Sequence, residues 1–346
     1  MSGRNLRFIN TLILILLCIL GLTGLYGLVW PFPSFLFEIH RLAGWALIVL
    51  IPWKAAISLR SLSRGFGRRW DHNATILISI LLTIATVTLL ILVLLWTWQI
   101  GPYYAWIENY AYSGIGWHWG IALYLAPLFI LHIWQRWPRP KKVDFAGRRQ
   151  FLKLMGLGAA AIVGWGVSEA LAKSVESKGA ERRFTGSREE GSFQGNAHPV
   201  TTAPDQGKIK LDPSTWSLTV KGAVNKPLTL SYQDTLILAE SASEVTTTLD
   251  CTGGWYTQQT WHGIPLTKLL SSAQLRPEAI GVVLRGLQGY TALFTLEQAR
   301  EILLATHVGG EVLNHSHGFP MRVVVPSRRG WQWVKWLVEI EVITVP

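Results

Sequence analysis

Residues 246–270 read "TTTLDCTGGWYTQQTWHGIPLTKLL", a β-rich run that breaks at one cysteine and two glycines. Thr, Trp and Tyr favour strands, whereas the two glycines allow a sharp turn and the close approach of a bulky group. Similar short runs, separated by turn residues and by two helical stretches, make up the rest of the C-terminal part. They predict an α+β domain with strands near residues 216–224, 244–251, 281–287, 322–326 and 336–345, and helices near 230–240 and 295–308.

Cys251 has no evident disulfide partner. The chain has 2 cysteines, and the other, Cys18, lies in a long apolar segment. This pattern excludes a disulfide framework, a Cys-x-x-Cys-His haem attachment and a four-cysteine cluster. A lone cysteine in an exported domain is most often buried and inert. The alternative is a thiolate that binds a metal, because any redox centre here must be held by histidine or by one thiolate.

The N-terminal part has the pattern of a membrane protein. Charged residues are only 15% of the 346 residues, against roughly 25% in soluble domains. Segments of about 20 apolar residues can cross a bilayer as helices. Four such segments lie at residues 9–30, 39–57, 74–98 and 116–134, and a weaker fifth lies at 152–172.

The net charge of +11 indicates orientation rather than nucleic-acid binding. Lys and Arg gather in the loops between the second and third segments and between the fourth and fifth, while loops 31–38 and 99–115 have none. By the positive-inside rule, the N-terminus and both basic loops are cytoplasmic. The C-terminal domain is then expected outside the cytoplasm, attached to a multi-pass anchor in the cell membrane.

The fifth segment opens with "GRRQFLKLMGLGAAA", residues 147–161. It resembles the twin-arginine export signal, with Gly147 in place of the usual hydroxyl residue. The alternative is an ordinary basic anchor, since paired arginines beside a span are common. The export interpretation implies that the C-terminal domain folds around a cofactor in the cytoplasm before it crosses the membrane. A polar linker is expected over residues 174–195.

Four histidines, His40, His72, His118 and His132, lie in or beside the apolar segments. A lone histidine near a helix end is more often an interfacial group than a ligand. His118 and His132 are 14 residues apart, so they share one helix face about 21 Å apart in depth. With the expected topology, His40 pairs with His118 on the outer side, and His72 pairs with His132 on the inner side.

Each pair can supply the two axial imidazoles of a b-type haem. Residues 35–135 resemble the four-helix, two-haem b-type cytochromes of bacterial membranes. The sequence therefore predicts two haems b, or one outer haem if His72, which we place in a loop at the mouth of its helix, is not a ligand.

Three blocks of the C-terminal domain resemble the sulfite oxidase family of molybdenum enzymes. They are residues 212–235, residues 246–270 and "LNHSHGFPMRVVVPSRRGWQWVKWLVEIEV" at 313–342, within a resemblance that covers about 196–346. The most specific part runs from His-Gly-x-Pro-x-Arg to Val-Lys-Trp. The resemblance implies one molybdopterin, with its molybdenum bound by the thiolate of Cys251. It also implies that the pterin and its phosphate are bound by His198, His317, Arg322 and Lys335.

The resemblance is weaker for the substrate than for the cofactor. Sulfite-oxidising members have arginines soon after the cysteine, whereas this chain has Thr252, Gly253, Gly254 and Trp255. In this respect the C-terminal domain is more similar to the bacterial reductases of the family, which act on sulfoxides such as protein-bound methionine sulfoxide. Arg285, Arg328 or Arg329 remain candidates to supply positive charge. We expect the tryptophans 255, 261, 331, 333 and 336 to pack rather than to bind substrate.

The sequence predicts an all-α transmembrane bundle, with four spans and a twin-arginine-type fifth segment, followed by an α+β molybdopterin domain. The corresponding boundaries are 1–140, 141–173, a linker at 174–195, and 196–346. The expected function is oxygen-atom transfer on a small-molecule or sulfoxide-type substrate, with electrons exchanged through the haems with quinone or quinol in the lipid. Two alternatives remain: a haem-only electron carrier with a non-catalytic binding domain, and a structural or sensor protein with neither cofactor.

Overall fold

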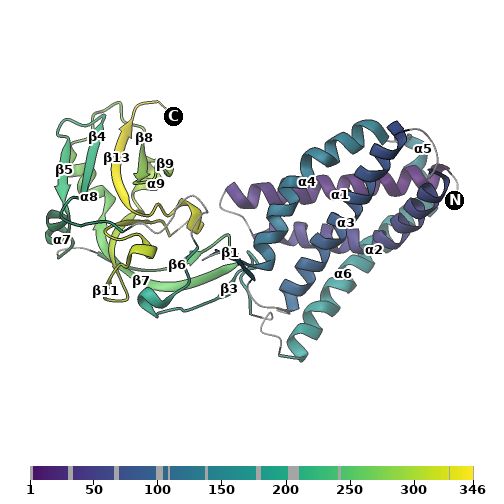
Figure 1. Cartoon of the computed structure of the whole chain (residues 1–346), viewed down its shortest axis with the longest axis horizontal. Helices are drawn as coiled ribbons and strands as arrows, with labels where there is room; N and C mark the ends of the chain where they lie inside the picture. The colour runs from purple at the N-terminus through teal and green to yellow at the C-terminus, as the bar shows by residue number, and fades with distance from the viewer. Residues whose placement is uncertain are drawn as a thin grey trace. The chain divides into compact units, whose positions relative to one another are not determined.

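The protein divides into two compact units in the computed structural model, and each is described by itself (Figure 1). Unit 1 comprises Met1–Tyr104 and Tyr112–Gly186, and unit 2 comprises Ala105–Ala111 and Ser187–Pro346. The structure describes residues 3–29, 34–65, 70–98, 104–107, 110–136, 139–176, 181–201, 210–240, 243–326 and 328–345.

Unit 1 is built from long helices. They are α1 (Gly3–Val29), α2 (Ser34–Gly65), α3 (Trp70–Trp98), α4 (Gly114–Arg136) and α6 (Arg148–Ser174), with the short α5 (Lys142–Phe145) before α6. By length and composition, these five long helices could each cross a membrane. The predicted segments fall within them, except that residue 30, the end of the first segment, lies outside the described residues. The fifth, expected to be weaker, forms a 27-residue helix as long as α1.

Backbone contacts pair α1 with α2, α3 with α4, and α2 with α6. The small apolar core of unit 1 contains Phe8, Ile9, Leu12 and Leu50. Many large apolar side chains point away from the helices instead of into this core, among them Leu22, Leu77, Ile84, Tyr124, Ile130 and Ile162. An apolar outer surface of this kind is costly in water and suits contact with lipid or with another protein.

The boundary between the two units, Gly186/Ser187, falls inside the predicted linker. The end of unit 1 is held on its helices: Arg41 of α2 donates to Phe184 O at 2.8 Å, and Trp96 Nε1 of α3 donates to Gly186 O at 2.9 Å. Arg182 also pairs with Glu169 of α6. Part of the predicted linker thus makes specific contacts, although the predicted domain boundaries remain predictions.

Unit 2 is a mixed α+β fold with two sheets (Figure 1). The first sheet contains β3 (Arg188–Glu189), β6 (Ser243–Asp250), β7 (Trp255–Pro265), β10 (Leu303–Val308), β11 (Glu311–Val312) and β12 (Arg322–Val324). The second contains β4 (Ser217–Gly222), β5 (Leu228–Ser231), β8 (Gly281–Gly286), β9 (Thr291–Thr295) and β13 (Leu337–Ile343). The strands expected from the sequence correspond to β4, β6, β8, β12 and β13. A separate two-stranded sheet pairs β1 (Tyr104–Ile107) with β2 (Tyr110–Tyr112).

The inner strand faces and the helices α7 (Tyr232–Glu240), α8 (Leu266–Ala273) and α9 (Leu296–Ala299) enclose the core of unit 2. Burial follows the sequence period. In β7, Trp255, Thr257, Gln259 and Trp261 alternate inward, as expected for a half-buried strand. In α8, Leu266, Leu269, Leu270 and Ala273 share one buried helical face.

The helix predicted over residues 295–308 is largely wrong. Thr295 caps a helix, as its capping box with Gln298 indicates, but α9 ends at Ala299. Residues Leu303–Val308 form β10, which pairs antiparallel with both β7 and β12. Leu and Ala in this stretch favour a helix locally, and the tertiary strand pairing overrides that preference.

Candidate active site

Cys251 lies in the tight turn between β6 and β7. Its N–H donates to Trp255 O at 2.9 Å, and Gly254 N–H donates to Cys251 O at 3.1 Å. Gly254 has φ +90°, a conformation that glycine adopts without strain. The sharp turn predicted after the cysteine is confirmed, and it places the cysteine side chain at 8% exposure.

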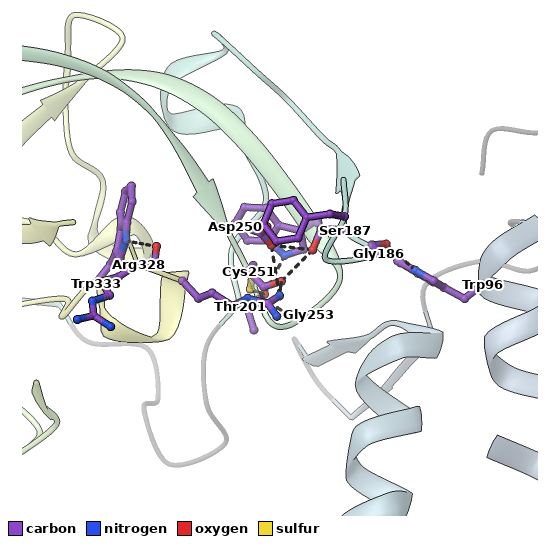
Figure 2. Close-up of polar contacts among 12 residues, drawn as sticks. Trp96, Gly186, Ser187, Thr201, Asp250, Cys251, Gly253, Arg328 and Trp333 are labelled. Carbon is purple, nitrogen blue, oxygen red and sulfur yellow. Dashed lines mark hydrogen bonds and ion pairs between the residues drawn. The ribbon is translucent and has the colours of Figure 1, made fainter. Parts of the chain in front are cut away.

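The thiol of Cys251 has two hydrogen-bonding partners among the described residues. Its Sγ donates to Thr201 Oγ1 at 3.3 Å and accepts from Gly253 N–H at 3.3 Å (Figure 2). Burial raises the pKa of this thiol, although those two bonds and the charges of Arg329 and Lys335 act in the opposite direction. The protein alone therefore favours the neutral thiol, and a bound metal ion is the group that converts such a thiol into a thiolate.

The other four residues predicted to bind the cofactor gather near Cys251. The rings of His198 and His317 lie 3.9 Å apart between centroids. Arg322 Nη1 donates to His317 O at 3.1 Å. Lys335 Nζ donates to Ser316 O at 2.9 Å, and the charges of Lys335 and Arg322 both act on the Cys251 thiol. Residues more than 130 positions apart in the chain thus form one cationic cluster.

Short irregular segments position this cluster. His198 follows η1 (Gly195–Ala197), and its Nδ1 donates to Gly195 O at 2.6 Å. His317 closes η2 (His315–His317), whose first turn is capped by the side chain of Asn314. Arg322 begins β12, and Lys335 lies between η3 (Gly330–Gln332) and β13.

Several polar atoms of the cluster are buried without a hydrogen-bond partner among the described residues. They include His317 Nε2 and Arg322 Nε, on side chains that are each 2% exposed. In that same part of the chain, no carboxylate forms an ion pair with Arg322 or Lys335. Buried donors and cations without partners are costly, and an anionic ligand with phosphate oxygens would satisfy them. The residues therefore fit a phosphate-bearing cofactor.

Tryptophans enclose the cationic cluster. The Arg322 guanidinium lies 5.0 Å from the ring centroid of Trp261 and 5.6 Å from that of Trp333. Cation–π contacts of this kind partly replace the lost hydration of a buried arginine. The prediction that the tryptophans pack is confirmed for the four buried ones, Trp255, Trp261, Trp333 and Trp336.

Sequence reasoning missed Thr201 and the Asp250–Arg329 pair. Thr201 Oγ1 accepts from Trp255 Nε1 at 3.0 Å as well as from the thiol. Arg329 Nη2 lies 3.3 Å from Asp250 Oδ1 and donates to Cys251 O at 3.1 Å. Ser187 Oγ also donates to Asp250 Oδ1, at 2.7 Å. The only available signal was that Asp250 precedes the cysteine and that two arginines follow β12.

Two of the arginines proposed as substrate groups are already bound to carboxylates. Arg285 pairs with Glu339 at 3.1 Å and with Glu341 at 3.6 Å, both on β13. Arg329 is paired with Asp250 as described above. Their charges are largely balanced, so neither resembles the free arginine of an anion-binding pocket.

A second histidine pair lies in unit 1. The rings of His40 on α2 and His118 on α4 have centroids 6.3 Å apart and planes at 78°. His40 Nδ1 lies 2.8 Å from Thr23 Oγ1, and His118 Nδ1 lies 3.2 Å from Leu89 O. The predicted outer pair is therefore brought together.

The predicted inner pair is only partly described. His132 Nδ1 lies 3.4 Å from Ser79 Oγ, so His132 faces α3. The backbone of His72 lies within α3 and not in a loop before it, but its side chain lies outside the described residues. The pairing of His72 with His132 remains a prediction.

Gly318 is expected to be essential for the shape of the cluster. It has φ +109°, and a Cβ there would lie 3.0 Å from Arg322 Cβ and 3.1 Å from Lys335 Cβ. Gly318→Ala should lower the free energy of unfolding of unit 2 by about 1–3 kcal/mol and reduce the bound molybdenum. Gly289→Ala is the matched control, because Gly289 has φ +79° but nothing lies within 4 Å of its Cβ position. Thermal unfolding measures the stability of both variants. Equal decreases in the free energy of unfolding would show that the steric contact at Gly318 does not matter.

Lys335 is expected to make the cofactor-free protein sensitive to pH. Burial, followed by the charge of Arg322, lowers the pKa of Lys335 to about 7. Between about pH 7 and about pH 10 the unfolded chain binds a proton that the folded chain does not, so stability rises with pH across this window. Lys335→Met should flatten that rise in protein made without molybdopterin synthesis, whereas Lys226→Met at an exposed position should not. Thermal unfolding at several pH values measures how stability changes with pH. The same rise of stability with pH in Lys335→Met as in the wild type would contradict this prediction.

Residues 206–346 match the family model described as "Oxidoreductase molybdopterin binding domain". A Bacillus subtilis (strain 168) protein, "Uncharacterized oxidoreductase YuiH", is 33% identical over 133 residues, which are 38% of this chain and 66% of that protein. The NADPH nitrate reductase of Beauveria bassiana is 27% identical over 179 residues, covering 44% of this chain and 19% of the reductase. The chain thus spans slightly less than two thirds of the first relative and about a fifth of the second.

The "Protein-methionine-sulfoxide reductase catalytic subunit MsrP" of Gluconobacter oxydans (strain 621H) is 26% identical over 245 residues. This alignment covers 60% of this chain and 75% of that protein. Since the family model matches only residues 206–346 at the end of the chain, the likeness to this relative extends further toward the N-terminus.

Proposed function

We propose that this chain, whose C-terminal unit is a molybdopterin-binding oxidoreductase domain, is a membrane-anchored enzyme that reduces a sulfoxide-type substrate with electrons from the quinone pool. The observation that carries the proposal is the buried thiol of Cys251 beside a cationic cluster with unpartnered donors. The family match and this geometry agree on the cofactor. The anchor, the haems, the quinone and the substrate are the parts that we propose.

Different residues would bind the metal and the pterin of the cofactor. Cys251 would supply the sulfur ligand to molybdenum, and His198, His317, Arg322 and Lys335 would bind the pterin and its phosphate. When bound, molybdenum supplies oxygen-atom transfer with a change of two electrons. Gly253 would keep the metal side of the thiol accessible, because a Cβ there would lie 3.5 Å from Sγ and 3.2 Å from Thr201 Oγ1.

The unit 1 helices support a membrane anchor. Five of them have the length and composition of spans, and their large apolar side chains are exposed to the surroundings. The basic residues at the predicted cytoplasmic ends, including Arg148 and Arg149, agree with an orientation that exports unit 2. We infer that unit 2 lies outside the cytoplasm. It would be exported by the twin-arginine route, with α6 carrying the export signal.

The His40–His118 pair supports a haem b in unit 1. His40 and His118 would hold one iron between them if their ring centroids were about 6 Å apart, the separation expected from metal–imidazole bonds of roughly 2.0–2.1 Å as known for zinc. The observed separation is 6.3 Å. Leu89 O can only accept a hydrogen bond, so His118 Nδ1 carries the proton and its Nε2 is free to bind iron. The fit of these residues supports an outer haem, whereas a second haem at His72 and His132 rests on the sequence pattern.

The proposed electron route uses quinol, the haems and the molybdenum site, since haems transfer electrons singly and the metal changes by two. A sulfoxide is favoured over sulfite for two reasons. The residues after Cys251 carry no positive charge, and Arg285 and Arg329 are bound to carboxylates. A relative whose printed name is a protein-methionine-sulfoxide reductase also shows likeness over 60% of this chain.

The purified full-length protein in detergent tests the proposal. We expect stoichiometric molybdenum and pterin, a b-type haem spectrum, and reduction of methionine sulfoxide with a quinol analogue as donor. Sulfite oxidation is tested in parallel with a quinone acceptor. The proposal fails if the molybdenum-loaded protein turns over no sulfoxide or oxidises only sulfite.

A further inference from the structure

His40 contacts a threonine on the neighbouring helix. Thr23 Oγ1 of α1 lies 2.8 Å from His40 Nδ1. The same hydroxyl donates to Ile19 O at 2.6 Å, one helical turn earlier. A hydroxyl has one proton, and that proton is directed at the Ile19 carbonyl. Thr23 Oγ1 therefore accepts from His40 Nδ1–H, which leaves His40 Nε2 unprotonated.

His118 has the same tautomer for a different reason. Its Nδ1 donates to the backbone carbonyl of Leu89 at 3.2 Å, so no side-chain substitution can remove that bond. The two Nε2 atoms are thus both available for a metal, and the ring planes stand at 78°. His40 also has a hydrogen bond with the backbone of Leu20, which a side-chain substitution leaves in place. Among these contacts of His40 and His118, the Thr23 hydroxyl is the one that a substitution removes.

We propose that Thr23 is the positioning residue of the outer haem: its hydroxyl fixes the tautomer and the ring plane of His40 and keeps the two axial imidazoles nearly perpendicular. The inference rests on the proposed haem at His40 and His118 and goes beyond it, because it assigns the ligand orientation to a residue that does not touch the iron. Hydrogen bonds to the outer nitrogen of a ligating histidine set its orientation and raise its basicity.

Two measurable properties follow from this contact. A more basic imidazole stabilises ferric iron, so the Thr23 contact lowers the midpoint potential of the outer haem. Perpendicular axial planes leave the two iron π orbitals nearly equal in energy, which gives a low-spin ferric signal with one large g value. Without the contact the His40 ring can rotate toward the plane of His118, and that signal changes to a rhombic one.

The matched control lies on the same helix. Thr11 of α1 is buried like Thr23, and its hydroxyl makes the same backbone bond, to Arg7 O at 2.8 Å. Thr11→Val therefore removes an equivalent hydroxyl that has no histidine contact among the described residues. Thr23→Ser keeps the hydroxyl and should restore wild-type behaviour.

The experiment compares the full-length haem-loaded protein with its Thr23→Val, Thr23→Ser and Thr11→Val variants, by redox titration and by electron paramagnetic resonance. We expect Thr23→Val alone to shift one midpoint potential upward and to replace the large-g signal with a rhombic one. If Thr23→Val does not fold, Thr23→Ala is measured in its place. Unchanged potential and signal in haem-loaded Thr23→Val, or in Thr23→Ala where that variant replaces it, overturn the inference.

His40→Ala separates this inference from the proposed haem itself. If His40→Ala loses a haem while Thr23→Val behaves as wild type, the haem proposal stands and the positioning role is refuted. If His40→Ala keeps all its haem, the proposed outer haem and the positioning role are both refuted.

Discussion

Replacing Cys251 with serine is expected to reduce substrate turnover to background while leaving the haem spectrum of unit 1 unchanged. A serine hydroxyl is nearly isosteric with the thiol, but it remains protonated and is a poor ligand for a soft, thiolate-binding metal site. The cationic cluster is untouched, so some pterin can still bind. The loss should therefore affect activity far more than folding.

Cys18→Ser is the matched control for this prediction. Cys18 is the other cysteine of the chain, and it is exposed on α1, whereas Cys251 is buried. Molybdenum content, haem content and sulfoxide turnover are measured for both variants. Turnover at the wild-type level in Cys251→Ser would refute the role of Cys251 as metal ligand.

The second large effect is expected at the outer histidine pair. His40→Ala and His118→Ala should each remove the same haem, because one iron needs both imidazoles. The double variant should lose no more haem than either single variant, a non-additivity that marks two residues acting on one group. Haem content should fall by about half if the inner haem is present, or to none if it is absent.

The pyridine haemochrome and the reduced-minus-oxidised spectrum measure this loss. His262→Ala is a suitable control, because His262 is half-buried on β7 of unit 2 and is not a proposed ligand. Full haem content in His40→Ala would remove the support that the paired rings give to the proposed cytochrome. Molybdenum content should be unchanged in all four variants.

Local patterns in the sequence were sufficient for much of the fold. The apolar segments predicted the long helices, and β-rich runs predicted strands such as β6 and β13. Residues 303–308 were predicted as helix because their local preference is ambiguous. Their strand conformation depends on pairing with β7 and β12, which is not visible in the sequence of that segment.

The residues proposed to bind the cofactor were predicted from a motif and not from spacing. His317, Arg322 and Lys335 lie in one quoted block, and the structure brings them to Cys251, which lies more than 60 residues earlier. Thr201 and Thr23 were missed, because a threonine beside a distant side chain leaves no local pattern. Their partners, Cys251 and His40, lie 50 and 17 residues away in the chain.

The alternative functions that the sequence left open are not equally supported by the structure and the family match. A non-catalytic C-terminal domain does not explain the match of residues 206–346 to a molybdopterin-binding oxidoreductase domain. It also leaves His317 Nε2 and Arg322 Nε buried with no hydrogen-bond partner among the described residues. Sulfite is disfavoured as the substrate because two of the three candidate arginines, Arg285 and Arg329, are paired with carboxylates.

The most direct test of the proposed function follows the haem spectrum of the full-length, molybdenum-loaded protein without oxygen. The haem is first reduced with a quinol analogue, and methionine sulfoxide is then added in a stopped-flow instrument. We predict that the haem is reoxidised in the wild type and stays reduced in Cys251→Ser. A haem that stays reduced in the molybdenum-loaded wild type, or that is reoxidised equally in Cys251→Ser, would contradict electron transfer from haem to substrate through the Cys251 site.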